Sequence, residues 1–116
     1  MKAPGSMNQK SKKASPLNLR EADIRAQVKD FLEWQGWFVF YHLQGLGSYP
    51  GLPDLQAVKN GRTLYIEVKK PGGRQSEHQR RFQQAVESAG GTYVLAKGVD
   101  DLKLIDRRDR HERNKA

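Results

Sequence analysis

Residues 53–70 have the sequence Pro-Asp-Leu-Gln-Ala-Val-Lys-Asn-Gly-Arg-Thr-Leu-Tyr-Ile-Glu-Val-Lys-Lys, and this stretch decides the fold. Two short runs typical of β-strands flank Asn60-Gly61. That dipeptide favours a two-residue type I′ turn, which needs a positive φ at both central positions. A two-residue loop pairs Lys59 with Arg62, and the register of an antiparallel hairpin follows from that pair. The apolar residues then share one face, with Leu55 opposite Ile66 and Ala57 opposite Leu64.

The other face of the predicted hairpin carries charged groups. Asp54 falls directly opposite Glu67, and Lys69 projects from the same face. Directly opposed residues have Cβ atoms roughly 4.5–5.5 Å apart, where like charges repel each other. Two such carboxylates need a shared proton or a cation, and a hard divalent cation such as Mg²⁺ suits oxygen ligands that leave room for water and phosphate. The hairpin therefore predicts a metal site beside a lysine, although each half alone would also suit an ordinary turn or a half-exposed strand.

Further short motifs surround the hairpin. They are Gly51-Leu52-Pro53-Asp54, Ile66-Glu67-Val68-Lys69, Pro71-Gly72-Gly73 and Ser76-Glu77-His78-Gln79. Together they resemble the VRR-NUC family of the PD-(D/E)XK nuclease superfamily, over most of the chain from about Glu21 to Leu102. The resemblance implies an α/β domain with a restriction-endonuclease-like core. It also implies a metal-dependent endonuclease that hydrolyses phosphodiester bonds in DNA.

The resemblance assigns roles to individual residues. Asp54 and Glu67 would hold Mg²⁺ or Mn²⁺, with the carbonyl of Val68 as a further ligand. Glu21 matches a family glutamate that lies near the metal on the first helix. Lys69 would position the attacking water or stabilise the transition state, and the sequence leaves that choice open.

Gln79 matches a family glutamine beside the active site. Both Glu21 and Gln79 also have a structural interpretation. Asn18 with Glu21, and Ser76 with Gln79, fit the spacing of helix capping boxes. Either pair is therefore explained by helix initiation alone.

Basic and aromatic side chains near these motifs are candidates for DNA contacts. The candidates are Lys70, Arg74, Arg80, Arg81, His42 and Tyr49. The arginines and Lys70 are expected to follow phosphates. His42 suits either a structural role or a phosphate contact, and Tyr49 either packs or stacks on a base or sugar. The glycine-rich loop 44–53 is expected to lie beside the cleaved strand, since glycine permits close backbone approach.

The periodicity predicts the order helix, strand, hairpin, helix, strand. We expect helices over 18–35 and 76–88, strands over 37–42 and 92–96, and a short helix or strand over 99–105. Segment 37–42 is continuously apolar, which predicts burial on both faces of the sheet. The expected apolar stripe of the second helix is Phe82, Ala85, Val86 and Ala89. The fold prediction is a four-stranded mixed sheet flanked by helices.

Length and composition limit the class of protein. A chain of 116 residues makes one domain, and the absence of cysteine excludes disulfides and thiolate metal sites. With three histidines a zinc cluster is not expected. Without a long apolar run, we expect neither a membrane span nor a secretory signal, which favours a cytoplasmic protein.

The net charge of +8 sits mainly at the ends of the chain. Residues 1–20 carry five basic and no acidic residues, whereas residues 21–96 carry nine basic and eight acidic ones. We therefore divide the chain into a disordered basic tail (1–17), a nuclease domain (18–105) and a charged C-terminal tail (106–116). Basic tails suit nucleic acid phosphates, although they also serve solubility.

The sequence leaves several functions open. The first choice is a nuclease for branched DNA that resembles a Holliday-junction resolvase and acts as a homodimer, because a junction needs two nicks. The aromatic residues Trp34, Trp37, Phe38 and Tyr41 offer an interface, or else fill the monomer core. The alternatives are a flap or nicking nuclease, a DNA-binding module that does not cut, and a small basic RNA-associated protein.

Overall fold

The computed structural model describes residues 20–105. The predicted tails, residues 1–17 and 106–116, lie outside the described residues, as does Asn18 of the first predicted capping box. The elements follow the order α2 (Glu21–Trp34), β1 (Phe38–Tyr41), β2 (Leu55–Lys59), β3 (Arg62–Val68), α3 (Glu77–Ser88) and β4 (Thr92–Ala96). Residues 100–105 add a short helix. The predicted α/β order is confirmed. None of the helices within residues 20–105 has the length and apolar character needed to cross a membrane.

The four strands form one mixed sheet in the order β1-β2-β3-β4. Strands β1, β2 and β3 are antiparallel neighbours, and β4 runs parallel to β3 after the crossover through α3. The hairpin register is as predicted, with Leu55 opposite Ile66, Ala57 opposite Leu64 and Lys59 opposite Arg62. Asn60 and Gly61 adopt φ values of 53° and 78°, so both central turn residues have the positive φ that a type I′ turn requires.

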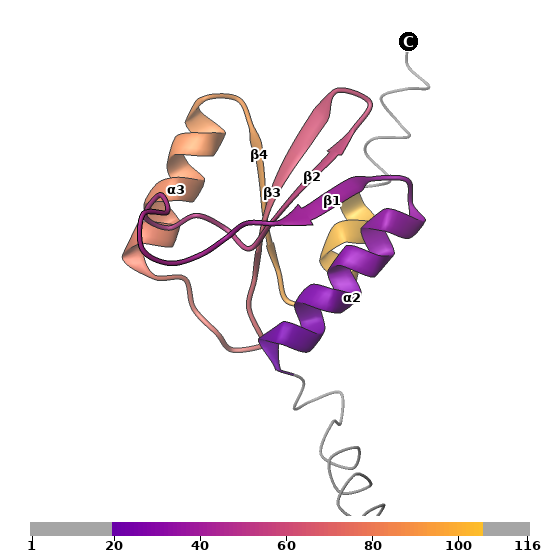
Figure 1. The fold of residues 1–116 in the computed structure, drawn as a ribbon, viewed down its shortest axis with the longest axis horizontal. Coiled ribbons are helices and arrows are strands. Elements are labelled where there is room, and N and C mark those ends of the chain that lie inside the picture. Colours follow the sequence, from indigo (N-terminus) through magenta and orange to yellow (C-terminus); the bar gives the residue numbers. More distant parts are fainter. Residues whose placement is uncertain (1–19, 106–116) are drawn as a thin grey trace, which may run out of the picture.

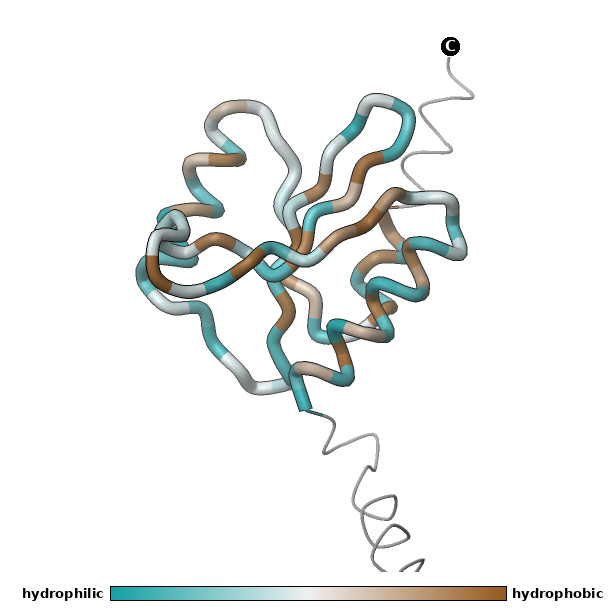
Figure 2. Tube along the Cα trace, in the orientation of Figure 1, coloured by the Kyte–Doolittle hydropathy of each residue, from teal (hydrophilic) through white to brown (hydrophobic). Residues whose placement is uncertain are grey.

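Helices cover the sheet on two sides (Figure 1). Helix α2 and the helix at 100–105 lie on one side, and α3 lies on the other. The hydrophobic core lies between the first pair and the sheet, and Figure 2 shows hydrophobic residues along the strands where α2 faces them. Its largest fully buried side chains include Ile24, Leu32, Leu55, Leu64, Ile66 and Leu102. This packing fixes the end of the hairpin that carries the charged residues.

Strand β1 differs from the prediction, because it is an edge strand rather than a strand buried on both faces. Val39 is buried against the core, whereas Phe38 and Tyr41 are 67% and 48% exposed. Trp37 is buried just before the strand, and Trp34 at the end of α2 is exposed. A continuous apolar run does not reveal how many neighbours a strand has, and within residues 20–105 only β2 pairs with β1.

Two details of the helices also differ from the prediction. Helix α2 begins after Arg20, whose backbone N–H donates to Asp23 Oδ2 at 3.3 Å, so Arg20 and Asp23 occupy the capping positions and Glu21 is the first helical residue. In α3 the expected stripe is only partly covered. Phe82 and Val86 are half-buried, whereas Ala85 and Ala89 are exposed. Helix α3 rests on the sheet through the Phe82 ring, which packs against two tyrosines of β3 and β4.

Candidate active site

The predicted carboxylates meet where β2 begins and β3 ends. Asp54 immediately precedes β2, and its Oδ2 accepts a hydrogen bond from the backbone N–H of Val68 at 2.8 Å. The second oxygen, Oδ1, faces Nη1 of Arg25 at 4.0 Å. One position beyond the last pair of the ladder, Leu55 with Ile66, the hairpin register places Asp54 opposite Glu67, and its hydrogen bond reaches Val68, the last residue of β3. A part for the Val68 carbonyl as a metal ligand remains a prediction.

Glu67 is the buried member of the pair, with only 3% of its surface exposed. Its Oε2 accepts a hydrogen bond from Gln79 Nε2 at 2.8 Å and lies 3.6 Å from Lys69 Nζ. Its Oε1 is buried and has no hydrogen-bond partner among the described residues. Burial, followed by the charge of Asp54, raises the pKa of Glu67 from 4.5 to about 7, and Lys69 opposes this shift.

The pKa of Asp54 shifts in the same direction. Burial raises the pKa of its carboxyl, while the Val68 N–H and the Arg25 guanidinium oppose the shift. The charge of Glu21 raises the pKa of Asp54 and of Glu67, so this residue acts on the pair electrostatically from the first turn of α2. Within residues 20–105, however, no three His, Cys, Asp or Glu side chains gather closely enough to hold a metal together.

The arrangement suits a divalent cation. Two carboxyl groups lie in a partly buried site, each costs energy to ionise, and Glu67 keeps a buried oxygen that no group within residues 20–105 pairs with. A hard divalent cation accepts oxygen ligands of this kind, often one or two carboxylates with water completing the shell. The donor set therefore fits Mg²⁺ or Mn²⁺, which Asp54 and Glu67 would hold.

Gln79 makes both of the contacts that were predicted for it, one in the helix cap and one beside the carboxylates. Its Oε1 accepts from the backbone N–H of Ser76 at 2.8 Å, and its own backbone N–H donates to Ser76 Oγ at 3.2 Å, which completes the capping box. The same side chain donates through Nε2 to Glu67. The cap holds the amide in place, so the beginning of α3 orients the buried carboxylate.

Comparison with known proteins supports the family suggested by these residues. A family model of the VRR-NUC domain matches residues 33–100, a segment that contains both carboxylates, Lys69 and Gln79. The chain belongs to the VRR-NUC family. This family is part of the PD-(D/E)XK superfamily, and the chain has its nuclease-type fold. Glu21 and Arg25 precede the matched segment.

One solved structure described as a VRR_NUC domain is similar in fold and sequence. The two chains are 25% identical, with a TM-score of 0.64, and the match covers 74% of this chain and 94% of that one. A comparison with curated proteins gave no match.

The glycine-rich loop of this VRR-NUC domain reaches α3. Gly51 has a φ of +79°, and a Cβ at this position would overlap the carbonyl oxygen of His78 and crowd the backbone nitrogen of Gln79. At Gly51 the close approach is therefore made to the protein backbone, and the position of the loop beside a cleaved strand remains a prediction. Gly51 fixes the first turn of α3 against the loop that leads into Asp54.

His42 and Gln44 brace the chain just before Asp54. The backbone N–H of His42 donates to the carbonyl of Asp54 at 2.8 Å, and its Nδ1 lies 2.8 Å from the carbonyl oxygen of Pro53. Its Nε2 lies 2.9 Å from Gln56 Oε1. Gln44 Nε2 donates to the carbonyl of Pro53 at 3.0 Å. Both ring nitrogens of His42, predicted as a DNA contact, are thus engaged within the protein.

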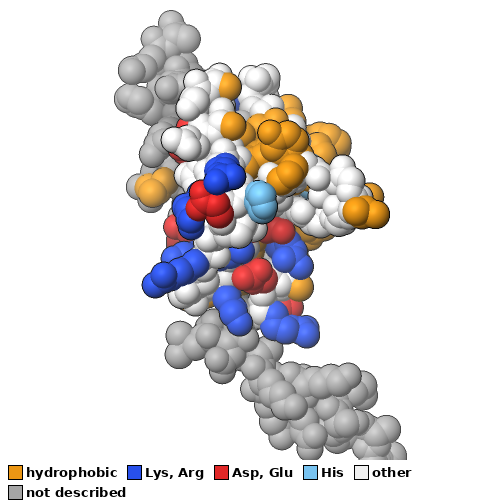
Figure 3. Space-filling view, turned by 90° about the vertical axis from the view of Figure 1, so that its left-hand side faces the viewer, with side chains coloured by type: hydrophobic (Ala, Val, Ile, Leu, Met, Phe, Trp, Pro, Cys, Tyr) orange, Lys and Arg blue, Asp and Glu red, His pale blue; other side chains and the backbone are white. Residues whose placement is uncertain are grey.

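The other predicted DNA contacts lie around α3. Lys70 and Arg74 lie between β3 and α3. Figure 3 views the side of the molecule that carries α3 and shows Lys and Arg side chains over its lower part. Arg80 and Arg81 both pair with Glu77, the latter at 3.2 Å between Nε and Oε2.

Tyr49 is 67% exposed, and its ring packs edge-on against Phe82 with 5.7 Å between centroids. This contact gives Tyr49 a packing role, while its exposed side stays available to a ligand.

Arg25 and Gln44 were missed by the sequence analysis. Arg25 lies four residues after Glu21, and this spacing places both on one face of α2, toward the carboxylates. That spacing was the available signal for Arg25. Gln44 carries no motif, and only the folded loop shows its contacts.

Proposed function

We propose that this domain is a metal-dependent DNA endonuclease that hydrolyses phosphodiester bonds. The observation that carries the proposal is Glu67, a buried carboxylate whose Oε1 has no partner within residues 20–105 and whose pKa is raised to about 7 beside a second carboxylate. Burying such a group costs folding energy unless a ligand compensates for it. A module that only binds DNA would have no use for this arrangement, which favours catalysis.

Asp54 and Glu67 would hold Mg²⁺ or Mn²⁺ in this function. When bound, the cation supplies a bound water of lowered pKa and offsets the charge that develops on the phosphate. The protein supplies the remaining groups. Gln79 keeps Glu67 in one orientation through its hydrogen bond, and the Val68 N–H does the same for Asp54. Lys69, beside Glu67 Oε2, either holds the attacking water or neutralises the phosphate in the transition state.

We further propose that the substrate is branched DNA and that two copies of the chain act together. Each described domain offers one such site, and a four-way junction needs a nick in each of two symmetry-related strands. The exposed rings of Trp34 and Phe38 support an isologous dimer, whereas Trp37 is buried within the domain and Tyr41 lines the pocket beside Asp54. Light scattering across a concentration series tests this, and a monomeric mass with and without junction DNA would favour a flap or nicking nuclease.

A cleavage assay tests the proposed activity. Linear duplex, single strand, flap and four-way junction are each incubated with Mn²⁺ or with EDTA. We expect the wild type to cleave the branched substrates in Mn²⁺ but not in EDTA. We expect no cleavage by Asp54→Asn, which removes a ligand while keeping the shape of the side chain. Binding without cleavage by the wild type would identify a DNA-binding module instead. Normal cleavage by Asp54→Asn would contradict the metal site.

A further inference from the structure

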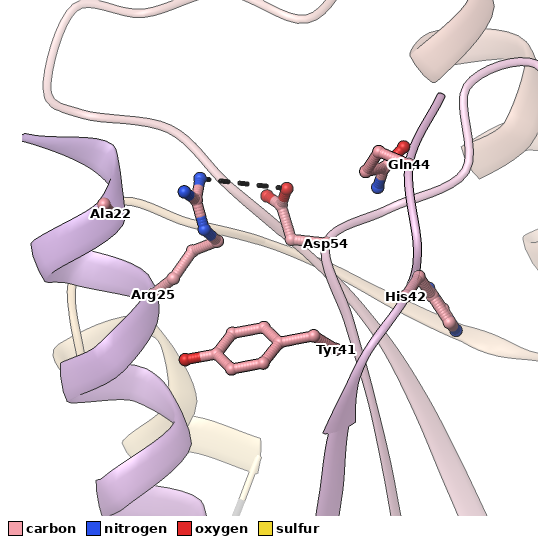
Figure 4. A pocket seen from close by; sticks show the side chains of 6 residues that line it. All are labelled: Ala22, Arg25, Tyr41, His42, Gln44 and Asp54. Atoms are coloured by element: carbon pink, nitrogen blue, oxygen red, sulfur yellow. Dashed lines mark ion pairs between the residues drawn. The ribbon is translucent and has the colours of Figure 1, made fainter. Parts of the chain in front are cut away.

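A pocket of ≈ 470 Å³ lies between α2 and the end of β1, directly beside Asp54. Its lining consists of Ala22, Arg25, Tyr41, His42, Gln44 and Asp54 (Figure 4). This volume falls within the range of pockets that bind small organic ligands. Apart from His42, none of the DNA contacts predicted from the sequence lies in it, so the pocket has a surface of its own next to the carboxylates.

Arg25 provides the positive charge of this pocket. Figure 4 shows its guanidinium pointing from α2 toward Asp54. The 4.0 Å between Nη1 and Oδ1 is too long for a hydrogen bond, and the side chain is 31% exposed. A guanidinium has five N–H donors in a planar fork that matches two oxygens of a phosphate. Arg25 can therefore keep its ion pair with Asp54 and bind a second anion from the pocket.

Tyr41 provides a flat surface in the same pocket. Its ring extends between β1 and α2 (Figure 4), and the residue is 48% exposed. Lys29 Nζ lies 6.0 Å from the ring centroid. Stacking of a base on an aromatic ring contributes about 1–3 kcal/mol and tolerates any base. The pocket thus has a phosphate-binding group, Arg25, on its α2 side and a stacking surface, Tyr41, on its β1 side.

The opposite side of the pocket is held by hydrogen bonds. His42 and Gln44 both contact the carbonyl oxygen of Pro53, at 2.8 and 3.0 Å. These contacts tie the segment that follows β1 to the segment that enters β2, so the wall keeps its shape beside Asp54.

We propose that this pocket binds the nucleotide next to the cleaved phosphodiester, with Arg25 on its phosphate and Tyr41 against its base. The inference rests on the proposed nuclease function and specifies its substrate. A base inside a duplex is stacked on both faces, so a base on Tyr41 has left the duplex. The pocket therefore selects DNA that is unpaired beside the cleaved bond, as at a junction or a flap.

Binding of a small nucleotide tests the pocket without cleavage. Thymidine 3′,5′-bisphosphate is titrated into the protein in EDTA, and backbone amide shifts are followed by NMR. We expect shifts at residues 22–25 and 41–44. Arg25→Gln should weaken binding about tenfold or more, because it removes a charge-assisted hydrogen bond. Tyr41→Ala should weaken it as well, whereas Tyr41→Phe should keep wild-type affinity because the ring remains.

The matched control is Lys103→Gln, which also removes one positive charge but lies outside the pocket lining. Lys103 Nζ pairs with Asp100 Oδ1 at 3.0 Å. Its nucleotide affinity should equal that of the wild type. The same spectra show whether each variant is folded, so unfolding is not mistaken for weaker binding. Unchanged affinity in Arg25→Gln, or shifts confined to α3, would overturn the proposal.

A second measurement separates this inference from the proposed function. Fluorescence anisotropy in Ca²⁺ compares binding of a flap with binding of a linear duplex. Tyr41→Ala should lose most of the preference for the flap. A wild type that cuts no DNA but binds the nucleotide at 22–25 and 41–44 would refute the nuclease and keep the pocket. If the wild type cuts DNA but Arg25→Gln and Tyr41→Ala both bind the nucleotide with wild-type affinity, the pocket proposal is refuted and the nuclease function is not.

Discussion

Replacing Glu67 by glutamine should stabilise the metal-free protein at neutral pH. The substitution keeps the shape of the side chain and an oxygen that accepts the hydrogen bond from Gln79. It removes a buried carboxyl group whose pKa is raised from 4.5 to about 7 by burial and by Asp54. Two carboxylates repel each other when no cation lies between them, so the loss of one negative charge should favour folding.

The size and pH range of this effect follow from proton linkage. Well below pH 4.5 the carboxyl of Glu67 is protonated in both folded and unfolded chains and contributes no difference. Between pH 4.5 and about 7 the folded state binds more protons, so stability falls as the pH rises. At about 1.4 kcal/mol per pKa unit, the full loss above pH 7 is roughly 3 kcal/mol. Glutamine does not titrate and should recover most of that loss.

Urea unfolding in EDTA at pH 5 and pH 8 measures the prediction. We expect Glu67→Gln to exceed the wild type by roughly 2–3 kcal/mol at pH 8 and by much less at pH 5. The control is Glu77→Gln, because Arg80 and Arg81 lower the pKa of this exposed glutamate and its loss should not stabilise the protein. A Glu67→Gln protein no more stable than the wild type at pH 8 would refute the reasoning, as would an equal gain at both pH values.

Three further predictions concern catalysis, packing and the tail. Lys69→Met should nearly abolish cleavage but keep metal-induced thermal stabilisation and most DNA affinity, because the ammonium acts on the transition state; an equal reduction of affinity and cleavage would make it a phosphate contact only. Gly51→Ala should cost more free energy of unfolding than Gly47→Ala, because both have a positive φ but only the first meets the backbone of His78; urea unfolding of the two variants compares them, and equal costs would contradict the packing argument. Deleting residues 1–16 should lower the salt dependence of DNA binding by roughly 0.9 in slope for each phosphate that the tail neutralises, with cleavage at saturating DNA preserved; an unchanged slope would show that the tail binds no phosphate.

The sequence alone determined the hairpin and the residues that it brings together. Asn60-Gly61 fixes the turn, and the period of two fixes which side chains share a face, so the position of Asp54 beside the end of β3 follows from local rules. The capping box of α3 is equally local, since Ser76 and Gln79 are three residues apart. Local geometry needs no knowledge of the remaining chain, and these predictions were correct.

Only the tertiary structure decided which distant groups complete the site. That β1 is an edge strand depends on the sheet order, which a run of apolar residues does not encode. Gln79 reaches Glu67, and Arg25 faces Asp54, only after α3 and α2 pack on opposite sides of the sheet. The pKa of Glu67 likewise depends on burial by those layers. Contacts between segments far apart in the chain arise from packing of whole elements, and no local pattern of residues specifies them.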